Sequence, residues 1–124
     1  MRISLLFAAA GLMIFGALGN AFVIVPDLHG DLIEIGVRPT VLGGTVLALH
    51  FGVLAECAFA AIVLTTAIQA MRGAAPPRVP LAIIAATYAA FGIMAFSRSH
   101  NPHHLGPLLM GVLIAAAILP RRIG

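Results

Sequence analysis

The sequence contains no tryptophan, one tyrosine and one cysteine among its 124 residues, and only 9% of the residues are charged. A single cysteine excludes an internal disulfide, and Cys57 lies in an apolar run where a thiol behaves as a small apolar side chain. So few charges exclude an ordinary soluble domain. The formal net charge of +3 requires no nucleic acid as a partner.

Hydrophobic residues make up 61% of the chain, and the mean hydropathy is +1.10. A helix that spans a bilayer needs roughly 20 apolar residues. Four segments qualify, over residues 3–25, 41–70, 79–97 and 103–119, and a loop over residues 26–40 separates the first two. We therefore expect an all-α fold in which residues 1–124 form one transmembrane domain, an integral membrane four-helix bundle.

The arginines predict how this bundle is oriented, because positive residues are enriched on the cytoplasmic side. If the four helices alternate in direction, five arginines fall on one side: Arg2, Arg72, Arg78, Arg121 and Arg122. Only Arg38 and Arg98 fall on the other side, together with most of the acidic residues. We expect a multi-pass protein of a bacterial inner membrane with both termini in the cytoplasm.

Small residues favour close helix packing in a bilayer. They recur in the first three predicted helices: Gly11, Gly16 and Gly19, then Gly43, Gly44 and Gly52, then Ala82, Ala85, Ala86, Ala89 and Ala90. They suit contacts within the bundle or between subunits. Because so short a chain has little interior of its own, we expect a homo-oligomer.

His50 and Glu56 are the ionisable residues inside the second predicted helix, and such residues indicate function by default. Helical geometry separates them by about 9 Å along the axis and ~120° of rotation, so they flank a face. Glu56 is a candidate catalytic residue, as a proton carrier, a ligand-orienting group or a substrate-binding acid. The alternative is a protonated acid that hydrogen-bonds across a helix interface.

The surroundings of His50 suit an apolar ligand held by one imidazole. Val53, Leu54 and Cys57 share its stripe, and Gly52 leaves room for a planar group. A neutral imidazole is a good ligand for haem iron, and a single axial histidine leaves the opposite coordination position open. We therefore predict that His50 binds the metal of a haem, the alternative being an imidazole that hydrogen-bonds to a neighbouring helix.

A second group of histidines, His100, His103 and His104, lies between the third and fourth predicted helices. We favour a polar turn over a metal site, because Asn101 and Pro102 form a typical N-cap and N1 pair. Arg98 lies beside this turn, on the same side of the membrane as His50. We expect it to bind the cofactor by pairing with a haem propionate.

Several of these features resemble the styrene oxide isomerases, small four-helix membrane enzymes that bind haem b. The similar pieces occur in the family's order: Gly11-Leu12-Met13-Ile14-Phe15, a loop with a proline, His50-Phe51-Gly52, Gly92 through Phe96-Ser97, and Asn101-Pro102. The resemblance implies that His50 is the axial haem ligand and that Glu56 replaces an active-site asparagine. It also implies a trimer with haem at the subunit interfaces.

In that family, ferric haem acts as a Lewis acid on an epoxide oxygen, and a hydride shift then gives an aldehyde. The resemblance therefore implies an isomerase whose substrate is a small apolar epoxide. This sequence differs from the family at two positions of the family's active-site pocket. The family has an aspartate and a tyrosine there, and this chain has Ala86 and Met94. The resemblance therefore supports haem binding by this chain more strongly than it supports the isomerase reaction.

Three other functions remain open on the sequence. One is a haem-binding sensor or carrier without catalysis. Another is a small oligomeric, proton-coupled transporter that uses Glu56 with His50 as its partner. The last is an accessory subunit that packs against a larger membrane complex.

Overall fold

The computed structural model describes residues 1–120, which form four helical rods and no strands. The first rod is continuous and the last begins with a 3-10 turn. In chain order the elements are α1 (Ile3–Gly19), η1 (Asn20–Ile24), α2 (Val25–Glu34), α3 (Pro39–Met71), α4 (Arg78–Ser99), η2 (Pro102–His104) and α5 (Leu105–Ile118). The predicted all-α, four-helix fold is confirmed.

The first rod is longer than the sequence indicates, because it continues through Pro26 to Glu34. The predicted loop over residues 26–40 is therefore wrong, and only residues 35–38 connect this rod to α3. A proline inside a helix lacks an N–H and clashes with the carbonyl four residues earlier. Here η1 is one turn of π-helix, in which the Val25 N–H bonds to Asn20 O, so Pro26 falls in the first turn of α2. A proline is tolerated at that position.

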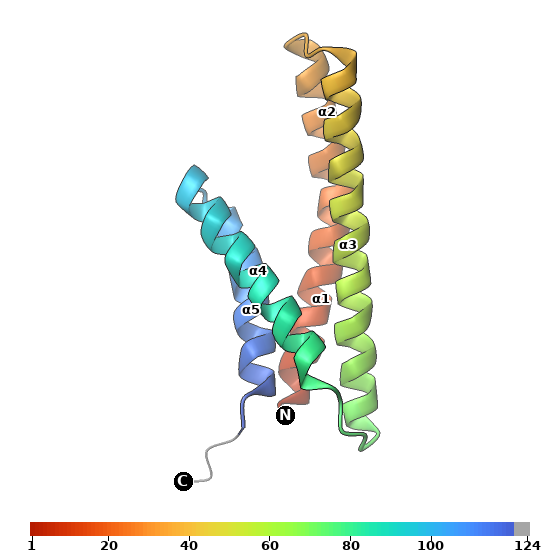
Figure 1. Cartoon of the computed structure of the whole chain (residues 1–124), viewed down its shortest axis with the longest axis vertical. Helices are drawn as coiled ribbons and strands as arrows, with labels where there is room; N and C mark the ends of the chain where they lie inside the picture. Colours follow the sequence, from red (N-terminus) through yellow and green to blue (C-terminus); the bar gives the residue numbers. More distant parts are fainter. Residues whose placement is uncertain (121–124) are drawn as a thin grey trace.

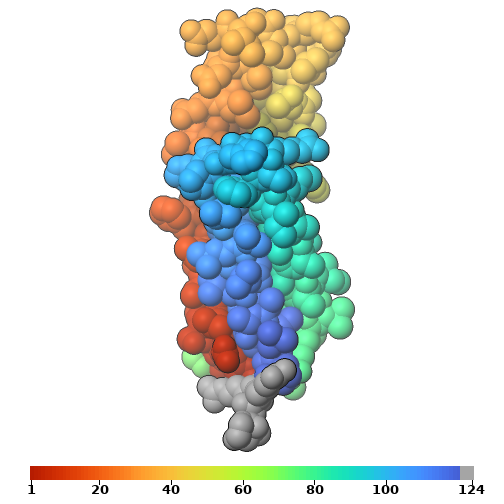
Figure 2. Space-filling model, turned by 90° about the vertical axis from the view of Figure 1, so that its left-hand side faces the viewer, coloured from red at the N-terminus to blue at the C-terminus, as the bar shows by residue number. Residues whose placement is uncertain are grey.

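The rods pair into two antiparallel hairpins, one of α1, η1 and α2 with α3, the other of α4 with α5 (Figure 1). We name the end that holds the N-terminus the proximal end, and the opposite end the distal end. The hairpins pack together at the proximal end and diverge toward the distal end. Figure 2 shows the first hairpin protruding beyond the tip of the second. The 32 residues of the first rod extend ~48 Å, whereas the 22 residues of α4 extend ~33 Å.

The hydrophobic core lies where the two hairpins meet. Its buried residues are Leu6, Ala9, Ala10, Met13, Ala60, Val63, Ala67, Leu81, Ile84, Ala85, Tyr88, Ile114 and Ala117. None of residues 39–59 of α3 is buried. The core therefore occupies the proximal part of the molecule and stops near Ala60 and Tyr88.

The closest helix contacts involve two glycines that join α4 to α5. A Cβ on Gly92 would lie 2.5 Å from the Leu108 nitrogen, and one on Gly111 would lie 2.6 Å from Ala85 O. The small residues expected to pack from α3 behave differently, since a Cβ on Gly43 would meet nothing within 4 Å. Gly44 and Gly52 are equally open. Among the glycines of residues 1–120, only those of the α4–α5 pairing are needed for close helix approach within one chain.

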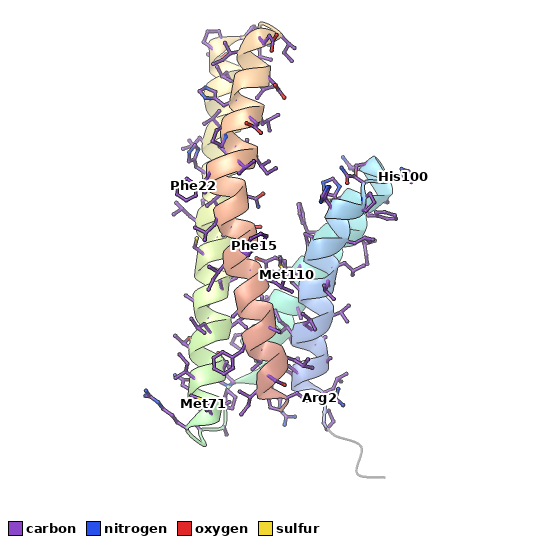
Figure 3. The ribbon with its side chains drawn as sticks, turned by 180° about the vertical axis from the view of Figure 1, so that it is seen from behind. Arg2, Phe15, Phe22, Met71, His100 and Met110 are labelled. Carbon is purple, nitrogen blue, oxygen red and sulfur yellow. The ribbon has the colours of Figure 1, made fainter. Side chains whose placement is uncertain are left out.

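Three helices are long and apolar enough to cross a membrane, and the helix over Pro102–Ile118 is apolar but shorter. Arg2 and Met71 lie at the proximal end and His100 lies at the distal end of α4 (Figure 3). The described arginines thus divide between the two ends as expected, while Arg121 and Arg122 lie outside the described residues. The fourth span and the cytoplasmic position of the termini stay predictions.

Candidate functional site on helix α3

Helix α3 carries both predicted site residues but presents them on different sides. His50 is exposed, whereas Glu56 is half-buried against the first rod. The same separation follows from Leu47, which shares the surface of His50, because nine positions along a helix are two and a half turns. Leu47 and Glu56 therefore lie on opposite sides of α3. The structure does not bring His50 and Glu56 into one site within a chain.

The imidazole of His50 is held by its own helix. Its Nδ1 atom lies 2.7 Å from the carbonyl oxygen of Val46, one turn earlier. Because a carbonyl only accepts hydrogen bonds, this contact assigns a ring proton to Nδ1, so in the neutral ring Nε2 is the nitrogen that carries the lone pair. A neutral imidazole whose other nitrogen is fixed by a hydrogen bond is the form that binds metals. The free Nε2 atom is thus the available ligand.

Beside His50 lies a shallow apolar depression on the surface of α3. It is lined by Gly44, Leu47, Ala48, His50, Phe51 and Leu54, all on this one helix. Apart from His50, the lining combines two small residues with three bulky apolar ones. A flat apolar ligand with a metal at its centre fits this chemistry, so these residues are compatible with haem.

Two residues expected to bind the cofactor lie outside the depression. Gly52 is exposed on α3 but does not line it, and Gly44 and Ala48 supply the small residues instead. Arg98 is exposed in the last turn of α4, at the end that diverges from α3. Their roles toward a haem stay predictions.

Glu56 pairs with the first rod through a hydrogen bond. Asn20 Nδ2 donates to Glu56 Oε2 over 2.9 Å, and both side chains are half-buried. Asn20 is also the first residue of the π-helical turn η1. Single π-helical turns inside α-helices are frequent at functional sites. The predicted helix-interface hydrogen bond of Glu56 is present, and its catalytic role stays a prediction.

Tyr88 is a buried polar residue that was not predicted from the sequence as a site residue. It is 6% exposed, and its hydroxyl oxygen is buried without a hydrogen-bond partner. Its ring meets the edge of Phe59 at a centroid distance of 6.2 Å. The available signal was that the chain's one tyrosine lies in mid-helix, away from the membrane interface where tyrosine is common.

The turn that carries the histidines, between α4 and η2, forms an N-terminal cap of η2. Asn101 Oδ1 accepts from the His103 backbone N–H at 3.0 Å, which confirms the predicted N-cap ahead of Pro102. Ser99 Oγ hydrogen-bonds to His104 Nδ1 and so links the two helices. Within residues 1–120 no three His, Cys, Asp or Glu side chains converge as metal ligands.

Comparison with protein-family models, with curated proteins and with solved structures finds no match to this chain. The likeness to the styrene oxide isomerases stays a prediction.

Proposed function

We propose that this chain is a multi-pass membrane protein that binds haem b through Nε2 of His50. The observation that carries the proposal is the contact between His50 Nδ1 and Val46 O, which leaves Nε2 free beside an apolar depression. One imidazole suffices to hold haem iron, so the absence of a second ligand among the described residues is compatible with it. The haem, when bound, would supply an iron centre for a substrate.

We further propose that the protein is an isomerase of small apolar epoxides. Bound ferric haem would supply a Lewis acid for the epoxide oxygen. The chain's own residues would hold the cofactor and keep water away, because Leu47, Phe51 and Leu54 present only apolar atoms beside His50. A water-poor surface protects a reactive carbon from hydrolysis.

The depression is open to the surroundings in a single chain, since all of its lining comes from α3. Lipid or a second copy of the chain would have to cover a haem held by these residues. A homo-oligomer, of which a trimer is one form, would cover the site and shield the substrate. This arrangement supports the proposal of an oligomer.

The test of haem binding is the visible spectrum of protein purified in mild detergent from haem-replete cells, oxidised and then reduced. We expect a Soret band that is lost in His50→Ala. His103→Ala and His104→Ala are matched controls that keep the band, because both histidines belong to the capping turn. An unchanged haem content in His50→Ala would refute the proposal.

Catalysis is tested separately from binding. Haem-loaded protein should convert an aryl epoxide to the aldehyde without added reductant, because the reaction is an isomerisation. Product is measured by gas chromatography, with free haem in the same detergent as the control. Loaded protein that gives no more aldehyde than free haem would leave a haem-binding module without this activity.

A further inference from the structure

Two helices carry unburied, largely apolar stripes that end in opposite charges at the distal end. The residues of each stripe follow one another at spacings of three or four, so they share one face of their helix. The Asp27 stripe follows the first rod and consists of Leu12, Phe15, Gly19, Val23 and Asp27. The Arg98 stripe follows α4 and consists of Ile83, Thr87, Phe91, Met94 and Arg98. None of these ten residues is buried.

Both stripes face away from the core of their own chain. Two positions along a helix correspond to 200° of rotation, so Phe15 lies opposite its buried neighbours Met13 and Ala17. On α4, Ile83 lies opposite the buried Ala85 for the same reason. Phe15 is 77% exposed and Ile83 is 60% exposed. Closing the gap between the two hairpins would therefore not bring the two stripes together within one chain.

The charges that end the two stripes lie at nearly the same height. The first rod and α4 both run from the proximal to the distal end (Figure 1). Asp27 lies seven residues, or ~10 Å, beyond Asn20, which contacts Glu56 of α3. Arg98 lies ten residues, or ~15 Å, beyond the tyrosine of α4, whose ring contacts α3 three residues, or ~4.5 Å, proximal to Glu56. Asp27 and Arg98 therefore differ in height by no more than about one helical turn.

Charge favours a second copy of the chain as the partner of each stripe. Copies that cross one membrane in the same orientation keep each residue at the same depth. The Asp27 stripe of one copy can therefore meet the Arg98 stripe of the next with opposite charges at one depth. Two identical stripes would instead place like charges together, which is unfavourable at an interface. Unlike stripes are thus the complementary pair.

The chain also exposes more surface than a compact monomer of its size. Its accessible surface is 8077 Å² for a mass of 12.8 kDa. A compact monomer of that mass exposes roughly 6,300 Å², so about 1,800 Å² is in excess. In a ring each chain buries two patches, and a standard interface takes about 800 Å² from each partner. The excess is therefore about the surface that a ring of copies covers.

We propose that the chain assembles into a ring in which the Asp27 stripe of each copy packs against the Arg98 stripe of the next. Asp27 pairs with Arg98 of the next copy at the distal end. Contact between unlike surfaces is head-to-tail, and such contacts generate a closed ring when the rotation between copies closes. Gly19 leaves room for a large side chain of the next copy, since a Cβ there would meet nothing within 4 Å. This interface goes beyond the proposed function, because it requires no haem and gives Arg98 a protein partner in place of the predicted propionate.

Cross-linking between copies tests the register of the interface. All variants carry Cys57→Ser, because Cys57 is exposed. Chains with Asp27→Cys and chains with Arg98→Cys carry different tags, are co-expressed, and are treated in membranes with a short bismaleimide. We expect cross-linked dimers that contain both tags. Glu34→Cys is the matched control for Asp27→Cys and should give few dimers, because Glu34 lies a further seven residues, or ~10 Å, along the first rod.

Three outcomes of this experiment would overturn the proposal. The first is the absence of cross-linked dimers, which would leave lipid against both stripes. The second is cross-linking between two copies of the same variant that exceeds cross-linking between unlike variants. The third is equal cross-linking by Glu34→Cys and Asp27→Cys.

Charge reversal tests the pair itself. Arg98→Glu should weaken association about fivefold or more, because an attraction is replaced by a repulsion. Adding Asp27→Arg to the same chain restores opposite charges at the interface and should recover most of the loss. Association is measured in detergent by sedimentation equilibrium. Unchanged association in Arg98→Glu, or no recovery in the double variant, would refute the pairing.

Discussion

The polar residues on the two sides of α3 differ in their exposure and in their hydrogen-bond partners. On one side His50 is exposed, and its ring is fixed only by the carbonyl of Val46 on its own helix. On the other side Glu56 is half-buried, and its partner Asn20 comes from another rod. The first arrangement leaves the Nε2 atom of His50 exposed on the surface of the chain. The second joins two helices through a hydrogen bond. One helix thus separates an exposed apolar depression from a packing interface.

The largest effect should come from filling the depression beside His50. In Ala48→Trp an indole would occupy the surface on which a planar ligand rests, so haem content should fall by about tenfold or more. Ala61→Trp is the matched control, because Ala61 is also exposed on α3 but lies outside the depression. Haem content is measured by the pyridine haemochrome assay after purification. Equal retention in both variants would place the haem elsewhere.

A second contrast concerns stability at the close contact between α4 and α5 and on the open part of α3. Gly92→Ala forces a methyl group against the backbone of Leu108 and should destabilise the protein by about 1–3 kcal/mol. Gly43→Ala meets nothing, and replacing a helical glycine by alanine should stabilise the protein by up to ~1 kcal/mol. Thermal unfolding in detergent, followed by circular dichroism, gives both values. A Gly43→Ala loss as large as that of Gly92→Ala would show that residues 39–59 are packed in the native assembly.

The smallest effect should be the coupling between Asn20 and Glu56. Hydrogen bonds between helices in membrane proteins average about 0.6 kcal/mol and reach about 1.7 kcal/mol. A double-mutant cycle with Asn20→Ala and Glu56→Ala, each of which removes the hydrogen bond, should give a coupling energy in this range. Haem content should not change in any of the three variants, because Glu56 lies away from the depression. Loss of haem in Glu56→Ala would contradict the separation of the two sides of α3.

The sequence predicted the helices well where hydropathy alone decides them. The predicted helix over residues 41–70 matches α3, which spans Pro39–Met71, and the predicted helix over residues 79–97 matches α4, which spans Arg78–Ser99. The error fell at Pro26, which looks like a helix end but lies in the first turn of α2 after a π-helical turn. Hydrophobic periodicity does not reveal a π-helical turn within a helix. The helix was therefore predicted to end at residue 25, and the loop after it was predicted too long.

The candidate site was predicted in its residues but not in its geometry. His50 and Glu56 stood out because both are polar within an apolar run, and the rotation between them already separated their faces. The partner of Glu56 could not be found this way, because Asn20 comes from a different rod and its position depends on how the rods pack. Tyr88 was missed for the same reason, since its burial and its contact with Phe59 of α3 depend on how the rods pack.

Chemical rescue of haem binding would test most directly whether the imidazole of His50 is the haem ligand. His50→Gly protein is titrated with haem in detergent, with and without free imidazole, and the Soret band is recorded. We expect no specific binding without imidazole and a restored spectrum when imidazole occupies the vacated position beside Gly44 and Phe51. Full haem binding by His50→Gly in the absence of imidazole would contradict the proposal that His50 holds the iron.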